Sequence, residues 1–384
     1  MMSTLGLIVF WFSLAIIAYT YIGYGALLAW LARRRARPVH SADIEPSVTV
    51  LVAAYNEAEC IGAKIENTLA LDYPADRLEL LVVTDGSDDA TSEIVGGYAA
   101  RYANVRLAHR PERRGKAHAL ARAFPLANGE ILLFSDANSL FAADILRHMV
   151  RHFADPEVGG VGGAKRMIGL EGVPGQGESL YWRYESFLKA CDSALSSVMG
   201  VPGEVWAARR VAYRPVEADT ILEDFVASLR LVEDGWRVVF EPRAIAYEAA
   251  SPSLRAEWER RVRNSAGGWQ AFFRLPGMLR HRNPWVTFQY LSHRMLRWMV
   301  TPSLFVLLLL SNLCLAGRSF YAATLLAQAL FYLLAGLGWL LARRGQQIRW
   351  LLAPFYIIML NAAALVGAWR FLRGRQGAVW QKVR

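Results

Sequence analysis

Four long apolar runs, one early in the chain and three late, constrain this sequence more than any other feature. Leu5–Trp30 carries no charged residue and is long enough to cross a hydrocarbon core of about 30 Å as a helix. The late runs are Trp298–Ala316, Ser319–Ala342 and Trp350–Trp369, and no comparable run lies between Arg33 and Arg297. The pattern predicts an N-terminal anchor, a large domain outside the bilayer, and a C-terminal membrane cluster.

Basic residues indicate how the chain is oriented. The segment "ARRRARP" follows the first apolar run, whereas a signal peptide carries its basic residues before the apolar core and a cleavage site after it. We therefore expect an uncleaved anchor. By the positive-inside rule the arginines stay in the cytoplasm, so we expect an integral membrane protein, of a bacterial inner membrane, with its catalytic domain in the cytosol.

The C-terminal tail conflicts with this orientation. Three late crossings would export the basic segment "RFLRGRQGAVWQKVR", against the positive-inside rule. Either the tail is exported or one run is re-entrant or interfacial. The expected division is an anchor at 1–32, a domain at 33–250, interfacial amphipathic helices at 251–290, about three membrane helices at 291–372 and a basic tail at 373–384.

Charge and cysteine content narrow the classes of partner. The net charge is +10, but much of the arginine excess flanks apolar runs, and no basic stripe interleaved with aromatics marks a nucleic-acid surface. We predict no nucleic-acid partner. The three cysteines are widely separated with no Cys-x-x-Cys spacing, which favours neither a zinc site nor a disulfide framework.

The middle domain alternates between strand and helix patterns. "SVTVLVAAY" (47–55), "LELLVVTDGSDD", "NVRLAH" and "EILLFSDANS" are typical of buried strands, and Lys116–Leu126 of a helix before the last one. Such alternation predicts a mostly parallel sheet with helices on both faces, and ligands bind beyond the carboxyl ends of its strands. Asp85 and Asp136 fall at such ends. Each is either a turn former or part of a nucleotide or metal site.

Five segments, taken in order, resemble the motifs of the membrane-integrated family 2 glycosyltransferases, which include cellulose, chitin and hyaluronan synthases and ceramide glucosyltransferase. They are "AAYNEAECI", "VVTDGSDDAT", "RRGKAHAL", "FSDANS" and "ILEDFVASLRLVEDGWRVVFEP". The resemblance runs from about Ser47 to Trp269 and rests on order and spacing. It implies an α/β GT-A (Rossmann-like) fold in the cytosol, joined to α-helical transmembrane segments.

The resemblance also implies a donor site for a nucleotide sugar. The leaving diphosphate needs a divalent cation and basic side chains. Asp136 and Asn138 stand at the family's Asp-x-Asp motif, and their oxygens suit Mg²⁺ or Mn²⁺, with the amide as the weaker ligand. The remaining donor-binding residues by resemblance are Ala54, Tyr55 and Glu57 for uracil, Asp85 for uridine, and Lys116 and Arg263 for the diphosphate.

On the acceptor side, "LED" (222–224) matches the motif whose Asp is the general base, so the resemblance makes Asp224 the catalytic residue and places Glu223 beside the acceptor. An inverting transfer needs such a carboxylate to deprotonate the attacking hydroxyl. Taken alone, the acidic pair also fits a helix N-terminus. Trp206, in "SVMGVPGEVWAARR", is either a stacking face for the acceptor or a core residue.

One motif departs from the family. Processive synthases carry Gln-x-x-Arg-Trp, and the matching positions here are Arg260, Arg263 and Asn264, so that only the arginine is retained. Trp258 or Trp269 would have to supply the missing aromatic; Trp269 is the candidate acceptor residue. The same segment also fits an amphipathic helix lying on anionic lipid.

These features predict a metal-dependent inverting glycosyltransferase that uses a nucleotide sugar, expected to be a UDP-sugar, to extend a β-linked exopolysaccharide or oligosaccharide. Its partners would be the donor, a saccharide or lipid-linked acceptor and membrane lipid, with room for a homo-oligomer or an export partner. Single-sugar transfer to a lipid acceptor uses the same residues. A non-catalytic sensor or assembly subunit and a nucleotidyltransferase are the weaker alternatives.

Overall fold

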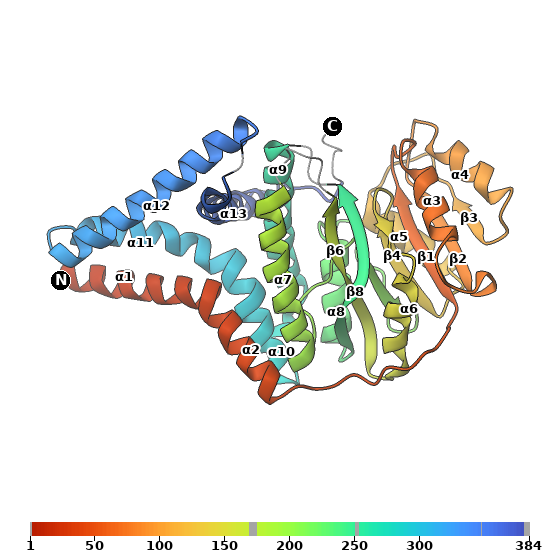
Figure 1. The fold of residues 1–384 in the computed structure, drawn as a ribbon, viewed down its shortest axis with the longest axis horizontal. Helices are drawn as coiled ribbons and strands as arrows, with labels where there is room; N and C mark the ends of the chain where they lie inside the picture. The colour runs from red at the N-terminus through yellow and green to blue at the C-terminus, as the bar shows by residue number, and fades with distance from the viewer. Residues whose placement is uncertain (1, 169–174, 250–252, 347, 380–384) are drawn as a thin grey trace.

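The computed structural model describes residues 2–168, 175–249, 253–346 and 348–379. Apolar helices gather at one end of the molecule and a sheet at the other, with α7 (Gly175–Leu195) and α9 (Leu254–Arg274) between them (Figure 1). The two halves therefore meet along helices that belong to neither the sheet nor the apolar bundle.

The sheet is mixed and has the strand order β3-β2-β1-β4-β7-β6-β8-β5. Strands β1 to β4 pair in parallel, as the sequence predicted. The other half departs from that prediction, because β7 runs antiparallel to β4 and β6, and β5 antiparallel to β8. The strands are β1 Val48–Ala54, β2 Leu78–Thr84, β3 Val105–Ala108, β4 Ile131–Asp136, β5 Leu140–Phe141, β6 Val158–Ile168, β7 Trp206–Arg209 and β8 Arg237–Ala249.

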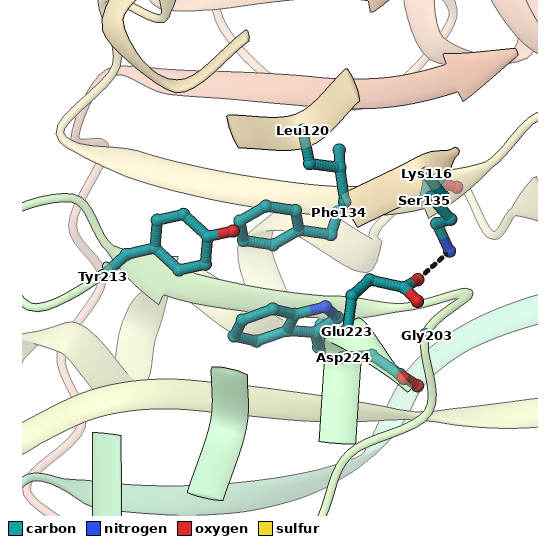
Figure 2. A pocket seen from close by; sticks show the side chains of 9 residues that line it. Lys116, Leu120, Phe134, Ser135, Gly203, Tyr213, Glu223 and Asp224 are labelled. Atoms are coloured by element: carbon teal, nitrogen blue, oxygen red, sulfur yellow. Dashed lines mark ion pairs between the residues drawn. The ribbon is translucent and has the colours of Figure 1, made fainter. Parts of the chain in front are cut away.

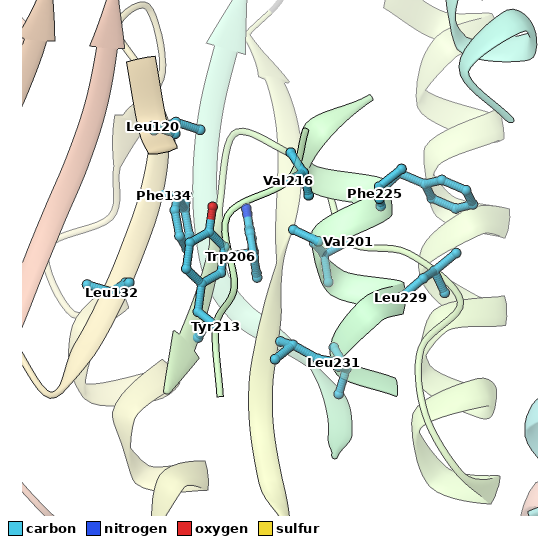
Figure 3. Close-up of a cluster of buried hydrophobic side chains, with 14 of the residues drawn as sticks. Leu120, Leu132, Phe134, Val201, Trp206, Tyr213, Val216, Phe225, Leu229 and Leu231 are labelled. Atoms are coloured by element: carbon cyan, nitrogen blue, oxygen red, sulfur yellow. The ribbon is translucent and has the colours of Figure 1, made fainter. Parts of the chain in front are cut away.

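Helices on both faces explain why the central strands are continuously apolar. Alternate side chains of a strand point to opposite faces, so Val50 packs with one core cluster and Leu51 with the other. The cluster around Phe134, Trp206 and Tyr213 fills the face beneath α5 and α8 (Figure 3). The helices near the sheet are α3 Ile61–Leu69, α4 Thr91–Ala99, α5 Lys116–Ala123, α6 Ile145–Val150 and α8 Glu223–Glu233.

Four helical stretches are long and apolar enough to cross a membrane: Thr4–Arg34, Pro284–Leu315, Ser319–Arg343 and Trp350–Leu372. Two of them contain π-helical turns, η1 (Tyr19–Gly23) and η6 (Tyr290–Val300). The second stretch begins earlier than its predicted apolar run, because η6 continues the helix through polar residues. The elements are α1 Met2–Ala18, α2 Tyr24–Arg34, α10 Pro284–Gln289, α11 Thr301–Leu315, α12 Ser319–Arg343 and α13 Arg349–Leu372.

The end of the described chain returns to the sheet. Helix α13 is seen almost end-on in Figure 1, whereas α1, α11 and α12 lie across the view. After α13, a Cβ placed on Gly115 would lie 3.2 Å from Cγ2 of Val379. The tail therefore lies on the same side as the sheet. This placement agrees with the expectation that one apolar run is re-entrant or interfacial, and the side of the membrane on which the tail lies stays a prediction.

Candidate active site

A cavity of about 1560 Å³ lies between the carboxyl ends of the central strands and the helices α9, η6 and α13. This is the edge at which open α/β sheets bind their ligands. Most of the residues predicted from the sequence line it: Ala54, Tyr55, Glu57, Asp85, Lys116, Asp136, Asn138, Glu223, Asp224 and Arg263. The structure thus gathers into one cavity residues that the sequence spreads from strand β1 to helix α9.

At the β1 end, an aromatic ring and a cation face each other. Ala54 is buried and its carbonyl accepts the backbone N–H of Asp85 at 3.2 Å. The Arg113 guanidinium lies 3.7 Å from the centre of the Tyr55 ring. A cation over an aromatic face is attractive, and both residues line the cavity.

Asp85 holds the loop that precedes α5. Its Oδ2 accepts the backbone N–H of Arg114 at 2.9 Å and of Gly115 at 2.6 Å. Gly115 has φ +94°, a conformation that glycine adopts without steric cost. The other oxygen, Oδ1, is buried and has no hydrogen-bond partner in the described structure. Asp85 therefore fixes the loop with one oxygen, while its second oxygen has no hydrogen bond within the described residues.

Lys116 lies between the predicted metal motif and the acidic pair that contains the predicted base. Its Nζ lies 2.7 Å from Oε1 of Glu223 (Figure 2) and 2.6 Å from Oδ1 of Asp136. Burial lowers the pKa of Lys116, but the fields of Asp136, Glu223 and Asp224 outweigh it and raise the pKa well above its ordinary value. The lysine is therefore a fixed cation between the two predicted motifs.

The residues at the end of β4 fit a hard divalent cation. Among the described residues, no three His, Cys, Asp or Glu side chains converge on a ready-made metal cage. Asp136 already has a cationic group against one oxygen, and Asn138 is exposed in the same cavity. Mg²⁺ is commonly held by one or two carboxylates together with substrate phosphates, which this arrangement allows.

Asp224 lies in the first turn of α8, beside Glu223, and its carboxylate faces the cavity next to Gly203 (Figure 2). Burial, and then the negative charge of Glu223, raise the pKa of Asp224 to about 7. Arg263 donates to the carbonyl of Ile221 at 2.8 Å, so α9 packs over this motif. A carboxylate with a pKa near neutrality is suited to accept a proton.

Comparison with known proteins identifies the family of the chain. A profile described as "Glycosyltransferase like family 2" matches residues 46–267, more than half of the chain. The chain belongs to this family. The match contains the strand ends, the Asp136 motif and the Asp224 motif, which supports the resemblance noted in the sequence and the GT-A-like mixed sheet.

Several relatives of this glycosyltransferase chain have names that describe a function. The poly-beta-1,6-N-acetyl-D-glucosamine synthase of Staphylococcus aureus strain COL is 28% identical over 244 residues, covering 62% of this chain and 58% of that protein. The synthase of that name from Staphylococcus epidermidis is 26% identical over 232 residues, covering 59% and 56%. The chain thus matches little more than half the length of these curated relatives.

A solved structure extends the similarity beyond the family segment. The mannosyltransferase PcManGT from Pyrobaculum calidifontis, in complex with GDP-Man and Mn²⁺, is 25% identical with a TM-score of 0.73. The alignment covers 96% of this chain and 100% of that one. The apolar helices, and not only the sheet, are therefore part of the shared architecture.

The structure corrects the placement of two tryptophans of the family 2 chain. Trp206 is only 2% exposed and stacks on Phe134 with ring centres 4.3 Å apart, so it belongs to the core. Trp269 faces Phe371 of α13 and does not line the cavity. It follows Asn264 by five residues, which rotates it about 140° around α9. Trp206 therefore matches the core alternative of the sequence prediction, and Trp269 lies outside the lining of the large cavity.

Trp298 of η6 lines the cavity instead. It packs against Gly268, which follows Asn264 by four residues and lies on the same face of α9, and against Phe225 with ring centres 5.1 Å apart. From the sequence, Trp298 is expected only as the start of an apolar run. The sequence does contain one signal for a functional role of Trp298, the arginine directly before it in "HRMLRW". Ionisable residues within a membrane helix are commonly functional.

Proposed function

We propose that this chain is a metal-dependent inverting glycosyltransferase that transfers a sugar from a nucleotide sugar to a saccharide acceptor at the cytoplasmic face of a membrane. Asp224 carries the proposal. It is the carboxylate with a pKa raised to about 7, and it faces the same cavity as the donor-side residues. The acceptor hydroxyl would enter between Asp224 and the anomeric carbon of the donor.

In the proposed step, the acceptor oxygen attacks the anomeric carbon, and the bond from that carbon to the diphosphate oxygen breaks. The hydroxyl proton passes to Asp224, and the nucleoside diphosphate leaves with the bonding electrons. Lys116 stabilises the negative charge that develops on the diphosphate. Asp136 and Asn138 would hold Mg²⁺ or Mn²⁺, which when bound neutralises the same charge.

The family relatives suggest both donor and product. The staphylococcal relatives are named as synthases of poly-β-1,6-N-acetyl-D-glucosamine, which supports a UDP-sugar donor and a β-linked exopolysaccharide. The mannosyltransferase holds GDP-Man, so a guanosine donor is the second candidate. Tyr55 and Arg113 line the end of the cavity at which either base would bind. An oligomer or an export partner remains a prediction.

The proposal is tested by incubating the purified chain in lipid with Mn²⁺ or Mg²⁺ and labelled UDP-GlcNAc, other UDP-sugars or GDP-mannose, beside Asp224→Asn. We expect one donor to give a labelled product that the substitution abolishes. Product length then separates the alternatives, since a polymer indicates a synthase and a single added sugar indicates transfer to a lipid acceptor. Donor binding without turnover by the wild type in any combination would contradict the proposal and favour a sensor.

A further inference from the structure

Cations gather in the part of the cavity that α7 and η6 line. Lys189 of α7 and Arg294 and Arg297 of η6 line it, together with Glu185. Lys189, Arg294 and Glu185 are buried, at 6%, 6% and 2% exposure. We call these four residues the inner cluster. The proposed donor chemistry uses none of them, although buried charges are costly to maintain.

Positive charge exceeds negative charge in the inner cluster. Glu185 is shared, lying 2.8 Å from Nη1 of Arg294 and 2.9 Å from Nη1 of Arg297. One carboxylate therefore faces two guanidinium groups and the neighbouring Lys189 ammonium. The nearest additional acid, Asp192, accepts hydrogen bonds from Tyr24 at 2.8 Å and Gln289 at 3.0 Å.

Other acidic groups approach from the catalytic side. The fields of Glu185, Glu204 and Asp224 reach Lys189, but Glu204 is paired with Lys165 at 2.7 Å, and Asp224 is the proposed base. His293 contacts Asp192 at 2.6 Å and Glu185 at 3.4 Å. The inner cluster thus has three cationic groups and one carboxylate, a formal excess of positive charge, in the same cavity as Asp224.

Membrane helices form the wall around this cluster. Arg294 and Arg297 belong to the candidate span Pro284–Leu315. Two further spans contribute polar groups to the same cavity, where the Asn361 amide donates to the Tyr21 hydroxyl at 2.6 Å. Ionisable and polar side chains within spans are expensive and commonly mark the path of a substrate. The cavity therefore connects the catalytic base to the region of the lipid chains.

A phosphate group matches this charge and position. Arginine binds phosphate through paired N–H groups, and such charge-assisted contacts are strong. In the proposed function the donor diphosphate already has Lys116 and the Asp136 motif, so the inner cluster is available to another anion. An acceptor that reaches the base from the bilayer must carry an apolar chain, and a phosphate at the junction of chain and sugar would lie at this depth.

We propose that Lys189, Arg294 and Arg297 bind the phosphate of a lipid-linked saccharide acceptor, with its lipid chain between the helices and its sugar hydroxyl at Asp224. This inference rests on the proposed function and specifies its acceptor. The phosphate contributes to binding only and does not react. The bonds formed and broken are those of the transfer already described, with the proton passing to Asp224 and the nucleoside diphosphate leaving.

Binding tests the inference without turnover. Labelled polyprenyl diphosphate-N-acetylglucosamine would be titrated into the full chain in mixed micelles, beside the same lipid joined to the sugar without phosphate. We expect the phosphate-bearing lipid to bind at least about tenfold more tightly, the ratio that one charge-assisted contact supports. Arg297→Gln should remove most of this difference, and Arg297→Lys, which keeps the charge, should retain part of it.

Arg343→Gln is the matched control, because Arg343 is exposed at the end of α12 and does not line the cavity. It should bind both lipids as the wild type does. Equal binding of the two lipids by the wild type, or an equal loss of both in Arg297→Gln, would overturn the inference. If Arg297→Gln does not fold, the wild-type comparison and competition by polyprenyl monophosphate decide. Donor turnover is not measured here, so failure of the proposed function gives a separate result.

Discussion

A single methyl group added at Gly203 should disturb the proposed base directly. Gly203 lines the cavity beside Asp224, and a Cβ placed on it would lie 2.7 Å from Oδ2 and 3.1 Å from Cγ of that carboxylate. Ordinary contact begins near 3.4 Å, so the carboxylate must retreat by about 0.7 Å. A catalytic group misplaced by about 1 Å can cost roughly 10²-fold in rate. We therefore expect Gly203→Ala to lower kcat by about 10-fold to 100-fold.

The KM for the donor should change little in Gly203→Ala, because Tyr55, Asp85 and Lys116 are not moved by this methyl group. Steady-state kinetics of donor turnover in lipid gives both values. Gly96→Ala is the matched control, since a Cβ on Gly96 in α4 meets nothing within 4 Å, and its kcat should equal that of the wild type. A kcat for Gly203→Ala within about twofold of the wild type would refute the reasoning that Asp224 must keep its position.

Further changes test the remaining parts of the site. Asp224→Asn should lower kcat by about 10² to 10⁴, the usual contribution of a general base, while the Kd for the donor, measured by titration, stays unchanged. Because the pKa of Asp224 is raised to about 7 and only the deprotonated form accepts a proton, kcat/KM should fall tenfold per pH unit below about pH 7. In Glu223→Gln this fall should begin at lower pH, because the charge of Glu223 is one cause of the raised pKa. Asp136→Asn should raise the Mn²⁺ concentration needed for half-maximal activity about tenfold or more, since a charged ligand becomes neutral. In thermal unfolding, Gly268→Ala should lower the Tm because its methyl group collides with the Trp298 ring, and such overpacking costs about 1–3 kcal/mol of folding free energy. Gly96→Ala should raise the Tm, because alanine has a higher helix propensity than glycine by about 1 kcal/mol.

Local patterns in the sequence were sufficient to bring the predicted donor residues to one edge of the sheet. Apolar strands that end in Asp85 and Asp136 place both acids at one edge of the sheet, because parallel strands share a direction. The same holds for Lys116, which begins a helix between two such strands. Each of these positions depends on a strand and the turn after it. Both can be recognised from the local order of apolar and polar residues.

The acceptor side depended on contacts that no local pattern contains. Whether Trp206 lies in the core or in the cavity is decided by its pairing partner Phe134 on β4. Trp298 reaches the cavity only because Gly268 lets two helices approach closely. The antiparallel direction of β7 likewise follows from how the chain returns from α7, and a strand of four residues carries no signal of its direction.

The return of the tail to Gly115 has a consequence for biosynthesis. Translation completes the sheet and its strand-end acids well before α13 is made, yet residues 375–377 and Val379 form part of the wall of the same cavity. That wall closes only after α13 has been inserted beside α9. A chain in which α13 is not yet beside α9 therefore lacks part of the wall of this cavity, although its sheet and strand-end acids are already complete.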